Sequence, residues 1–405
     1  MMKDTVVVLN AGSSSLKFSL FPLDGTDEAM LRGVVDGIGG RNPTLKVDDA
    51  SGTRVEQRVF DAASADEHTE ALAIVQECLQ RLAGNDARVA CVGHRVVHGG
   101  VKYTAPVVVD AAVLADLDVL VGLAPLHQPH NLAAIRAVAR ALPDVPQVAC
   151  FDTAFHRSHP HVADMYALPY EYFERGVRRY GFHGLSYEYV AEAMSVDAPA
   201  ISGGRVVVAH LGSGASLAAL RAGRSVDSTM GFTALDGLPM GTRTGQLDPG
   251  VVLHLIANEG LSLHALEDLF YRRSGLLGIS GVSNDMRELL AADAPRARLA
   301  VDYFVSRVAR EIGSLAVSLE GIDGLVFTAG IGQHSPEIRQ RVCDQLAWLG
   351  IDLDPGANAA NAPRISSGDS PVSVHVIPTD EERMIARHTV RALARQLQPL
   401  TEAIA

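Results

Sequence analysis

The chain has 405 residues, of which 47% are hydrophobic and 20% are charged, and its formal net charge is −12. This length exceeds one ordinary core and suits two domains of roughly 100 to 200 residues each. The composition is that of a globular protein and excludes a disordered chain. The negative charge argues against a general affinity for nucleic acid or anionic membranes, although a local basic pocket could still bind an anion.

The first apolar run, Val6 to Leu9, is too short for the core of a signal peptide. A longer apolar stretch near Val119 is broken by Pro125 and His127, so no segment reaches the roughly 20 residues that span a bilayer. No CxxC pair is present, and we expect neither a disulfide framework nor a zinc knuckle. We therefore expect a cytoplasmic protein whose cysteines stay reduced: Cys78, Cys91, Cys150 and Cys343.

The first predicted elements are two strands around a serine turn, in the stretch VVVLNAGSSSLKF that starts at Val6. Apolar and polar residues alternate from Leu16 to Leu20, which predicts a strand after the turn. A Walker phosphate loop requires G-x-x-x-x-G-K-[ST] leading into a helix, and the sequence around Lys17 lacks both features.

A similar stretch, VVVAHLGSGASL, starts at Val206. Gly12 matches Gly212 and Ser13 matches Ser213, an offset of 200 residues. A valine run is common, so coincidence is one interpretation. We favour a duplicated α/β domain, in which each half opens with a β-hairpin whose turn presents backbone N–H groups to an anion.

The stretch GHRVVHGG, residues 93–100, places His94 and His98 four residues apart. On a helix this spacing would form a metal pair, but valines favour a strand, where four residues span about 13 Å. We expect no shared metal there. Arg95 lies in an apolar strand, so it either pairs with an internal carboxylate or binds an anionic substrate.

Asp152 ends a predicted buried strand, PQVACFD, where α/β sheets place their ligands, although it could simply start a turn. The histidine cluster HRSHPH that follows contains Pro160, which indicates a surface loop rather than a zinc site. Glycines flank His183 in YGFHG and Arg243 in GTRTG, a pattern that suits either ligand approach or a tight turn. Together these features predict a site for phosphate and a small carboxylate.

Two predicted helix starts follow near the end of the chain. A strand, GLVFT, leads into the glycine loop AGIGQH, and Ser335 with Pro336 should begin a helix, so this region could contact a nucleotide. The stretch TDEE fits a capping box in which Thr379 caps the last helix and Glu382 reaches back.

Ten motifs occur in an order typical of one family: NAGSSSLKF, GHRVVHGG, LAPLH, FDTAFH, YGFHG, HLGSGAS, MGFTALDGLPMGTRTG, SGVSNDMR, FTAGIG and TDEERMIAR. On these motifs the chain resembles the acetate kinase (acetokinase) family from end to end. The resemblance implies an α/β fold of two duplicated actin-like (ribonuclease H-like) domains with a nucleotide cleft between them. Residues 1–153 with the C-terminal helix 386–405 would form one domain. Residues 154–385 would form the other, which would bind the nucleotide and mediate dimerisation.

The resemblance also implies roles for single residues. Arg95 would hold the acetate carboxylate, Arg243 the transferring phosphoryl group, and His183 would stabilise the transition state. Asp152 matches the family's essential acid; because acetate is already ionised at neutral pH, orientation and metal electrostatics are the better physical role. The remaining matches are the magnesium positions Asn10 and Glu381, the methyl pocket Val97, Leu126 and Phe182, and the nucleotide contacts Lys17, His210, Leu211, Gly212, Ser213, Gly214, Asp285, Met286, Arg287, Gly330, Ile331, Gly332, Gln333 and His334.

The implied reaction is reversible, direct in-line phosphoryl transfer from ATP to acetate, giving acetyl phosphate and ADP, with Mg²⁺ or Mn²⁺ as metal and a homodimer as assembly. Alternatives are a propionate or other short-chain acid kinase and, more distantly, an actin-like ATP-driven binding protein. The last gives Arg95, Arg243 and His183 no common task.

Four residues depart from the family pattern: Ser213 and Gln128 stand where asparagine is usual, Gln246 where aspartate is usual, and Ala234 where proline is usual. The Ser213 and Gln246 departures leave the choice of phosphoryl donor open. An alanine could admit an extra methylene, a difference worth about 1 to 3 kcal/mol, so acetate against propionate also stays open.

Overall fold

The computed structural model describes residues 3–12, 14–61, 68–83 and 87–402. The chain divides into two compact units, of which unit 1 is Met1–Ala154 with Asp380–Ala405 and unit 2 is Phe155–Thr379. The predicted match between Ser13 and Ser213 includes a residue outside the described ranges.

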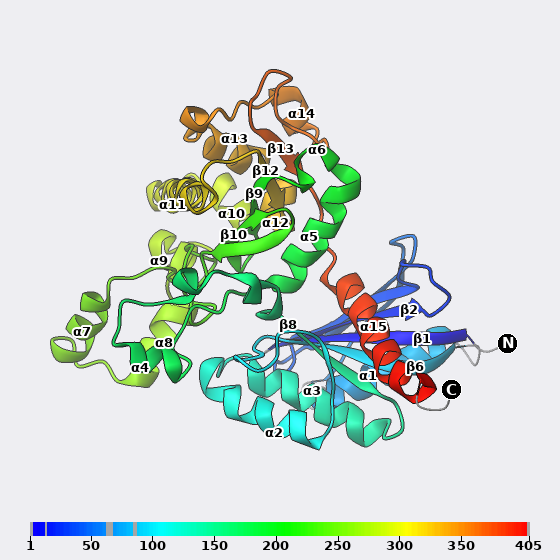
Figure 1. Ribbon diagram of the computed structural model, residues 1–405. Coiled ribbons are helices and arrows are strands. Elements are labelled where there is room, and N and C mark those ends of the chain that lie inside the picture. The colour runs from blue at the N-terminus through cyan, green and yellow to red at the C-terminus, as the bar shows by residue number, and fades with distance from the viewer. Residues whose placement is uncertain (1–2, 13, 62–67, 84–86, 403–405) are drawn as a thin grey trace. The chain divides into compact units, whose positions relative to one another are not determined.

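Unit 1 is built on a sheet in the order β5-β4-β3-β2-β1-β6-β8-β7 (Figure 1). Its strands are β1 (Lys3–Ala11), β2 (Ser15–Pro22), β3 (Leu31–Asp36), β4 (Thr44–Asp49), β5 (Arg54–Val59), β6 (Ala87–Val96), β7 (Val107–Val108) and β8 (Gln147–Phe151). Its helices are α1 (His68–Ala83), α2 (Ala111–Val119), η3 (Leu120–Leu123), α3 (Gln128–Ala141) and α15 (Glu381–Glu402).

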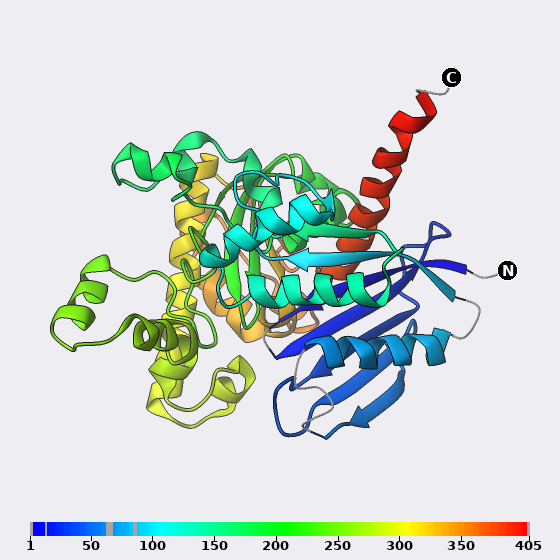
Figure 2. The ribbon, with the colours of Figure 1, turned by 90° about the horizontal axis from the view of Figure 1, so that it is seen from below.

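Helices cover both faces of this sheet, which explains the continuous valine run of β1. Helices α1 and α3 contact one another and share a core with Val7, Leu9 and Val92 (Figure 2). Helix α15 contacts β1, β6 and β8, and a Cβ on Gly93 would lie 2.3 Å from the Thr389 hydroxyl of this helix. Because neighbouring strand residues face opposite sides, Val92 and Gly93 place the two helix layers on opposite faces.

Unit 2 contains a five-stranded sheet in the order β11-β10-β9-β12-β13. The strands are β9 (Arg205–Leu211), β10 (Ala215–Arg221), β11 (Arg224–Ser228), β12 (Gly324–Thr328) and β13 (Ser373–Val376). Its helices are η4 (Ala154–Ser158), which begins at the last residue of unit 1, η5 (His161–Asp164), α4 (Tyr170–Glu174), α5 (Gly184–Asp197), α6 (Pro199–Ser202), α7 (Pro249–Ala257), α8 (Leu263–Arg272), α9 (Gly275–Ser280), α10 (Met286–Ala291), α11 (Pro295–Leu319), α12 (Ala329–His334), α13 (Pro336–Asp344), η6 (Ala347–Leu349) and α14 (Pro355–Ala359).

Two long helices pack on this second sheet. Helix α5 shares a core with Val206 and Val208 of β9, and α11 contacts β9 and β10. Figure 1 shows α5 and α11 on opposite sides of the sheet.

The two units repeat one strand order, because β3-β2-β1-β6-β8 corresponds to β11-β10-β9-β12-β13. In unit 1, β1 pairs antiparallel with β2 and parallel with β6, and β6 pairs parallel with β8. In unit 2, β9 pairs antiparallel with β10 and parallel with β12, and β12 pairs parallel with β13. The predicted duplication and the predicted hairpins are therefore confirmed. The strand that carries Lys17 is β2, so the rejection of a Walker loop is also confirmed.

Two local predictions are wrong. Residues 329–334, expected to form a glycine loop, form the short helix α12. The helix start expected after them is confirmed, because Ser335 is the N-cap residue and Pro336 is the first residue of α13, although the Ser335 side chain makes no capping bond. The last helix is capped by Asp380 rather than Thr379, since the Arg383 N–H donates to Asp380 Oδ1 at 2.9 Å. Arg32 fixes this aspartate by donating to both carboxylate oxygens, at 3.2 and 2.6 Å.

Among the described residues, no helix is long and apolar enough to cross a membrane. All four cysteines lie in the described ranges, and each is a buried free thiol.

Candidate functional site

The polar centre of unit 1 is an ion pair between Arg95 and Asp152. Arg95 lies near the carboxyl end of β6, and Asp152 directly follows β8, the neighbouring parallel strand. Arg95 Nη2 lies 2.7 Å from Asp152 Oδ2, and its Nη1 lies 3.2 Å from Glu381 Oε2. The Asp152 side chain is 2% exposed. The prediction that Arg95 pairs with an internal carboxylate is therefore confirmed, without excluding a substrate on its remaining donor surface.

These charges keep Arg95 ionised. Burial opposes the charged form, but the charges of Asp152 and Glu381 outweigh burial and raise the pKa of the guanidinium. One arginine between two carboxylates leaves this cluster with one surplus negative charge. Such a cluster can attract a divalent cation as well as orient an anion on the arginine.

Glu381 reaches Arg95 because it is the first residue of α15, directly after the Asp380 cap. The neighbouring Glu382 is partly exposed, and burial, followed by the negative charge of Glu381, raises its pKa. The helix is capped by Asp380, in place of the capping box that the sequence predicted between Thr379 and Glu382.

The hairpin of unit 1 contributes two further polar residues. The strand register pairs Asn10 of β1 with Lys17 of β2, and Lys17 is exposed. The register of β1 with β6 pairs Leu9 with His94, so Asn10 and Arg95 follow at the same end of neighbouring strands.

The fit of Mg²⁺ can be tested on these groups. Among the described residues, no group of three histidine, cysteine or acidic side chains could by itself hold a metal ion. Mg²⁺ does not require such a cage, because it usually keeps several waters and takes one or two carboxylates together with substrate phosphates. The oxygens of Glu381 and Asn10 are of the type that Mg²⁺ prefers, so the residues present fit this metal.

Two residues of α3 support this region: Asn131, which the sequence did not single out, and Gln128, which it marked only as a departure from the family pattern. Asn131 accepts from the Val97 N–H at 3.0 Å and donates to the Ala11 carbonyl at 2.8 Å, which joins the hairpin to the segment after β6. Gln128 bonds both the N–H and the carbonyl of His98, at 3.3 and 3.1 Å. Buried amides on an otherwise apolar helix face were the available sequence signal.

His183 occupies an unusual backbone position in unit 2. It precedes α5 with φ of 57°, in the left-handed region. Its Nδ1 lies 2.8 Å from Ser216 Oγ, and its ring stacks on His210 with centroids 4.3 Å apart. Ser216 also contacts the Tyr187 hydroxyl at 2.6 Å. The imidazole is therefore held on its Nδ1 side and on one face.

Arg243 and His183 converge on the hairpin of unit 2. A Cβ built on Gly214 would lie 3.4 Å from His183 Nε2 and 3.5 Å from Arg243 Nη2. Arg243 Nη1 donates to the Ala234 carbonyl at 2.9 Å. A side chain at Gly214 would thus make ordinary van der Waals contact with both residues, so His183 and Arg243 converge on this backbone turn, an arrangement that suits an anionic ligand.

The loop that carries Arg243 is fixed by backbone bonds. The N–H groups of Leu276 and Leu277 donate to the carbonyls of Met240 and Gly241, both at 2.9 Å, and Gly241 N–H donates to the Ser213 carbonyl at 3.1 Å. A side chain at Gly275 would meet the Met240 carbonyl at 2.1 Å. The arginine loop, α9 and the hairpin turn therefore form one rigid part of unit 2.

Other predicted nucleotide contacts lie near this part. A Cβ on Gly212 would lie 3.6 Å from the Cβ of Ala329 at the start of α12, and one on Gly241 would lie 3.2 Å from the Asn284 carbonyl. Asp285 accepts from the Arg287 N–H at 2.8 Å and caps α10. The hydrogen bond from the Arg287 side chain is the main cause that lowers the pKa of Asp285 to about 2.

The predicted contacts of the methyl group come from both units, and one expectation is corrected. Val97 and Leu126 belong to unit 1, Phe182 belongs to unit 2, and the side chain of Met286 is buried. The histidine cluster at residues 156–161 was expected on the surface, but His156 is fully buried. The polar sequence HRSHPH suggested exposure, because it does not reveal the distant hydrogen-bond partners that compensate the burial of His156.

Three comparisons relate this chain to known proteins. A family model described as the acetokinase family matches residues 5–387. An acetate kinase from Nitrobacter hamburgensis is 54% identical over 394 residues, which are 96% of each chain. The crystal structure of Porphyromonas gingivalis acetate kinase has a TM-score of 0.86 and 37% identity, covering 96% of this chain and 100% of that one. A propionate kinase from Francisella tularensis has a TM-score of 0.87 and 35% identity, covering 96% and 99%.

Proposed function

The chain belongs to the acetokinase family, and we propose that it transfers a phosphoryl group reversibly between ATP and acetate. The observation that carries the proposal is the convergence of Arg243 and His183 on Gly214 in the hairpin of unit 2. Two hydrogen-bond donors beside an open backbone turn suit the charge that spreads over the equatorial oxygens of a transferring phosphoryl group.

The proposal assigns the acceptor to unit 1. Arg95 binds the carboxylate of acetate, and Asp152 holds the guanidinium in its orientation through bonds of 2.7 and 3.0 Å. Acetate is ionised at neutral pH and needs no general base. Val97 and Leu126 of unit 1 and Phe182 of unit 2 are the proposed contacts of the methyl group.

The nucleotide belongs to unit 2 in this proposal, with Lys17 of unit 1 as a further contact. The turn from His210 to Gly214, the start of α10 and the short helix α12 supply its binding residues. Glu381 and Asn10 would hold Mg²⁺, or Mn²⁺, which would neutralise phosphate charge when bound. The homodimer and the cytoplasmic location that the family resemblance implies are further parts of the proposal.

The step itself is a direct displacement. A carboxylate oxygen of acetate attacks the γ-phosphorus, the bond from this phosphorus to the bridging oxygen breaks, and ADP leaves with the electron pair. Charge stabilisation and positioning by Arg95, Arg243 and His183 lower the barrier, and no covalent enzyme intermediate is required.

A propionate kinase is the second candidate, because a solved propionate kinase is among the similar structures and Ala234 is a small residue beside Arg243. A coupled assay of ADP release with acetate, propionate, butyrate or no acid, in the presence of Mg²⁺, tests both candidates. We expect the highest kcat/KM with acetate. A higher value with propionate would favour the second candidate, and equal ADP release without any acid would contradict both.

A further inference from the structure

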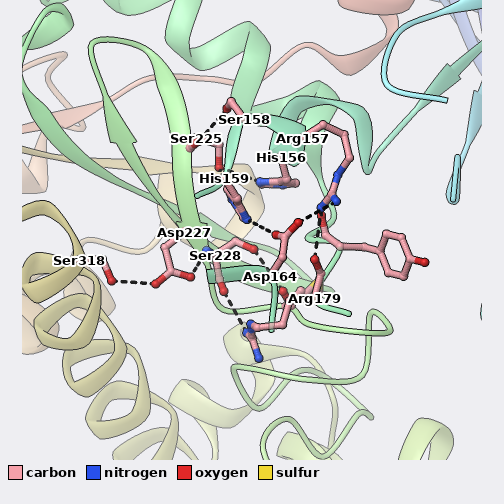
Figure 3. A network of polar contacts seen from close by, with 12 residues as sticks. His156, Arg157, Ser158, His159, Asp164, Arg179, Ser225, Asp227, Ser228 and Ser318 are labelled. Atoms are coloured by element: carbon pink, nitrogen blue, oxygen red, sulfur yellow. Dashed lines mark hydrogen bonds and ion pairs between the residues drawn. The ribbon is translucent and has the colours of Figure 1, made fainter. Parts of the chain in front are cut away.

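The histidine cluster after Asp152, which the proposed reaction does not use, hydrogen-bonds to the backbone that leads to His183. Figure 3 shows His156, Arg157 and His159 of this cluster with Asp164 and Ser225. His156 Nε2 lies 2.9 Å from the Phe182 carbonyl, and Arg157 Nη2 donates to the carbonyls of Arg179 and Tyr180 at 3.2 and 2.6 Å. Two neighbouring side chains thus hold three carbonyls within four residues. The peptide held by His156 is the one that joins Phe182 to His183.

The donors in this cluster can be assigned in order. The Phe182 carbonyl can only accept, so His156 Nε2 carries a proton. Burial lowers the pKa of His156 well below its usual value, so its Nδ1 is an acceptor. Ser225 Oγ, 2.8 Å away, therefore donates its single proton to His156 Nδ1. Ser225 Oγ must then accept from His159 Nε2, which also lies 2.8 Å away.

The hydrogen bonds that run from His156 through Ser225 to His159 end at the carboxylate of Asp164. His159 Nδ1 lies 3.2 Å from Asp164 Oδ1, and Arg157 Nη1 lies 3.1 Å from Asp164 Oδ2. Asp164 also accepts, through its backbone carbonyl, from the Arg179 N–H at 2.8 Å. His156, Arg157 and the Asp164 carbonyl therefore all hydrogen-bond to the backbone of residues 179–182.

Close packing by Gly181 and Tyr187 restricts the position of the His156 ring. Gly181 has φ of 73°, and a Cβ there would lie 2.5 Å from His156 Cγ. The ring also meets Tyr187 edge to face, with centroids 5.6 Å apart. Because Tyr187 contacts Ser216, the partner of His183, both sides of His183 are tied to the same cluster.

We propose that His156 is a positioning residue that, through the Phe182 carbonyl, holds His183 in its left-handed conformation, with Ser225, His159 and Asp164 fixing the orientation of His156. Positive φ is strained for a residue other than glycine and persists only where the surrounding structure over-determines it. The inference rests on the proposed role of His183 in phosphoryl transfer.

Two substitutions of His156 separate its two hydrogen bonds. In His156→Gln the longer amide reaches the place of Nε2 and can still donate to Phe182. In His156→Asn the shorter amide reaches only the place of Nδ1, toward Ser225. We expect His156→Asn to lower kcat about 10²-fold with KM for ATP changed less than about threefold, because a displacement near 1 Å can cost this much. His156→Gln should retain kcat within about fivefold.

His375→Gln is the matched control, because His375 is a buried histidine on β13 of the same unit and is assigned no part in the reaction. Ser225→Ala, which leaves the Phe182 bond in place, should lower kcat less than His156→Asn. Circular dichroism and urea unfolding identify variants that are still folded. Equal kcat values for folded His156→Asn and His156→Gln would overturn the proposal.

A second readout does not depend on activity. The ¹⁵N resonances of the His183 ring, recorded without nucleotide, report its bond to Ser216. We expect them to shift in His156→Asn and to stay near the wild-type positions in His156→Gln. Unchanged resonances in both variants would overturn the positioning role. A wild-type protein without acid-dependent ADP release would instead contradict the proposed function and leave this comparison intact.

Discussion

The two units share a strand order but differ in how each holds its arginine. In unit 1, Arg95 lies between the carboxylates of Asp152 and Glu381. In unit 2, Arg243 extends from a glycine-framed loop and donates to the neutral carbonyl of Ala234. The same strand order thus carries two different arginine environments, a buried ion-pair cluster in unit 1 and a loop with a neutral acceptor in unit 2. We expect the loss of Arg95 to lower stability more than the loss of Arg243, because Arg95 neutralises a buried carboxylate, whereas the carbonyl that accepts from Arg243 is neutral.

The hairpins differ in the same way. The register pairs Asn10 with Lys17 in unit 1 and His210 with Ser216 in unit 2. The first pair offers an amide and a cation, which suit a metal and a phosphate. The second pair supports the ring and Nδ1 of His183. The two hairpins thus share their antiparallel backbone pairing and differ in the side chains at the paired positions.

Arg95→Ala should have the largest effect, because it removes an anion-binding group and leaves the buried Asp152 without its cation. We expect loss of acetate-dependent activity by at least about 10³-fold. We also expect a decrease of about 3 to 5 kcal/mol in the free energy of unfolding, measured by urea titration. Arg88→Ala, which breaks the exposed pair with Asp4, is the control and should change the free energy of unfolding far less, because solvent screens this pair. Full activity in Arg95→Ala would contradict the assignment.

Arg243→Ala should separate catalysis from stability. We expect kcat to fall about 10²- to 10³-fold, because a donor to the phosphoryl group is lost. The free energy of unfolding should change less than in Arg95→Ala, because the Ala234 carbonyl that loses Arg243 is neutral, whereas the Asp152 carboxylate that loses Arg95 is buried and charged. Steady-state kinetics and urea unfolding of the same preparation test both expectations. A stability loss as large as that of Arg95→Ala would remove the proposed contrast between the units.

Glu381→Gln should weaken the response to Mg²⁺. We expect the Mg²⁺ concentration for half-maximal activity to rise about 10- to 100-fold, since a carboxylate ligand becomes a neutral amide. Titration of activity with Mg²⁺ at saturating ATP measures this change. Glu382→Gln is the neighbouring control, and an equal shift in both variants would argue against a specific role for Glu381.

His94 should make folding sensitive to acid. Burial is the main cause that lowers the pKa of His94 to about 4, against an ordinary value of 6.5, while its bond to Gln147 acts in the opposite direction. The unfolded chain binds a proton first, so stability is lost as pH falls from 6.5 to 4, by about 3 kcal/mol in total. In His94→Gln this part of the pH dependence should disappear. Parallel curves of unfolding free energy against pH for the two proteins would refute the expectation.

Glu382→Gln should have the smallest effect. Because burial raises the pKa of Glu382 above its unfolded value, its ionised form is penalised once pH exceeds that value. We expect the variant to be slightly more stable than wild type at pH 7, by less than about 1 kcal/mol, and equal to it at pH 4. Thermal unfolding at the two pH values measures the difference, and a less stable variant at pH 7 would contradict the sign.

Patterns along the sequence predicted the parts of the fold that depend on periodicity. Alternation after Gly12 predicted the first hairpin, and the offset to Gly212 predicted the duplicated sheet. The position of Asp152 after a buried strand also predicted its place beside a neighbouring strand end. These features depend on local side-chain alternation and on burial, which one sequence records directly.

Features that depend on distant partners were not predicted. Arg32 and Asp380 are 348 residues apart, and their ion pair fixes which residue caps α15. His156 is buried because Ser225 and Phe182, 69 and 26 residues away, complete its hydrogen bonds. Asn131 joins segments that only the sheet brings together. Local sequence does not record which distant group satisfies a polar side chain.

In the proposed reaction the phosphoryl group passes directly between ATP and the carboxylate, with charge stabilisation and no covalent enzyme intermediate. ATP that is chiral at the γ-phosphorus distinguishes this route from a covalent one, through the configuration of the phosphorus in the acetyl phosphate formed. A single in-line displacement predicts inversion. Net retention would require two displacements through a phosphorylated residue and would contradict the account.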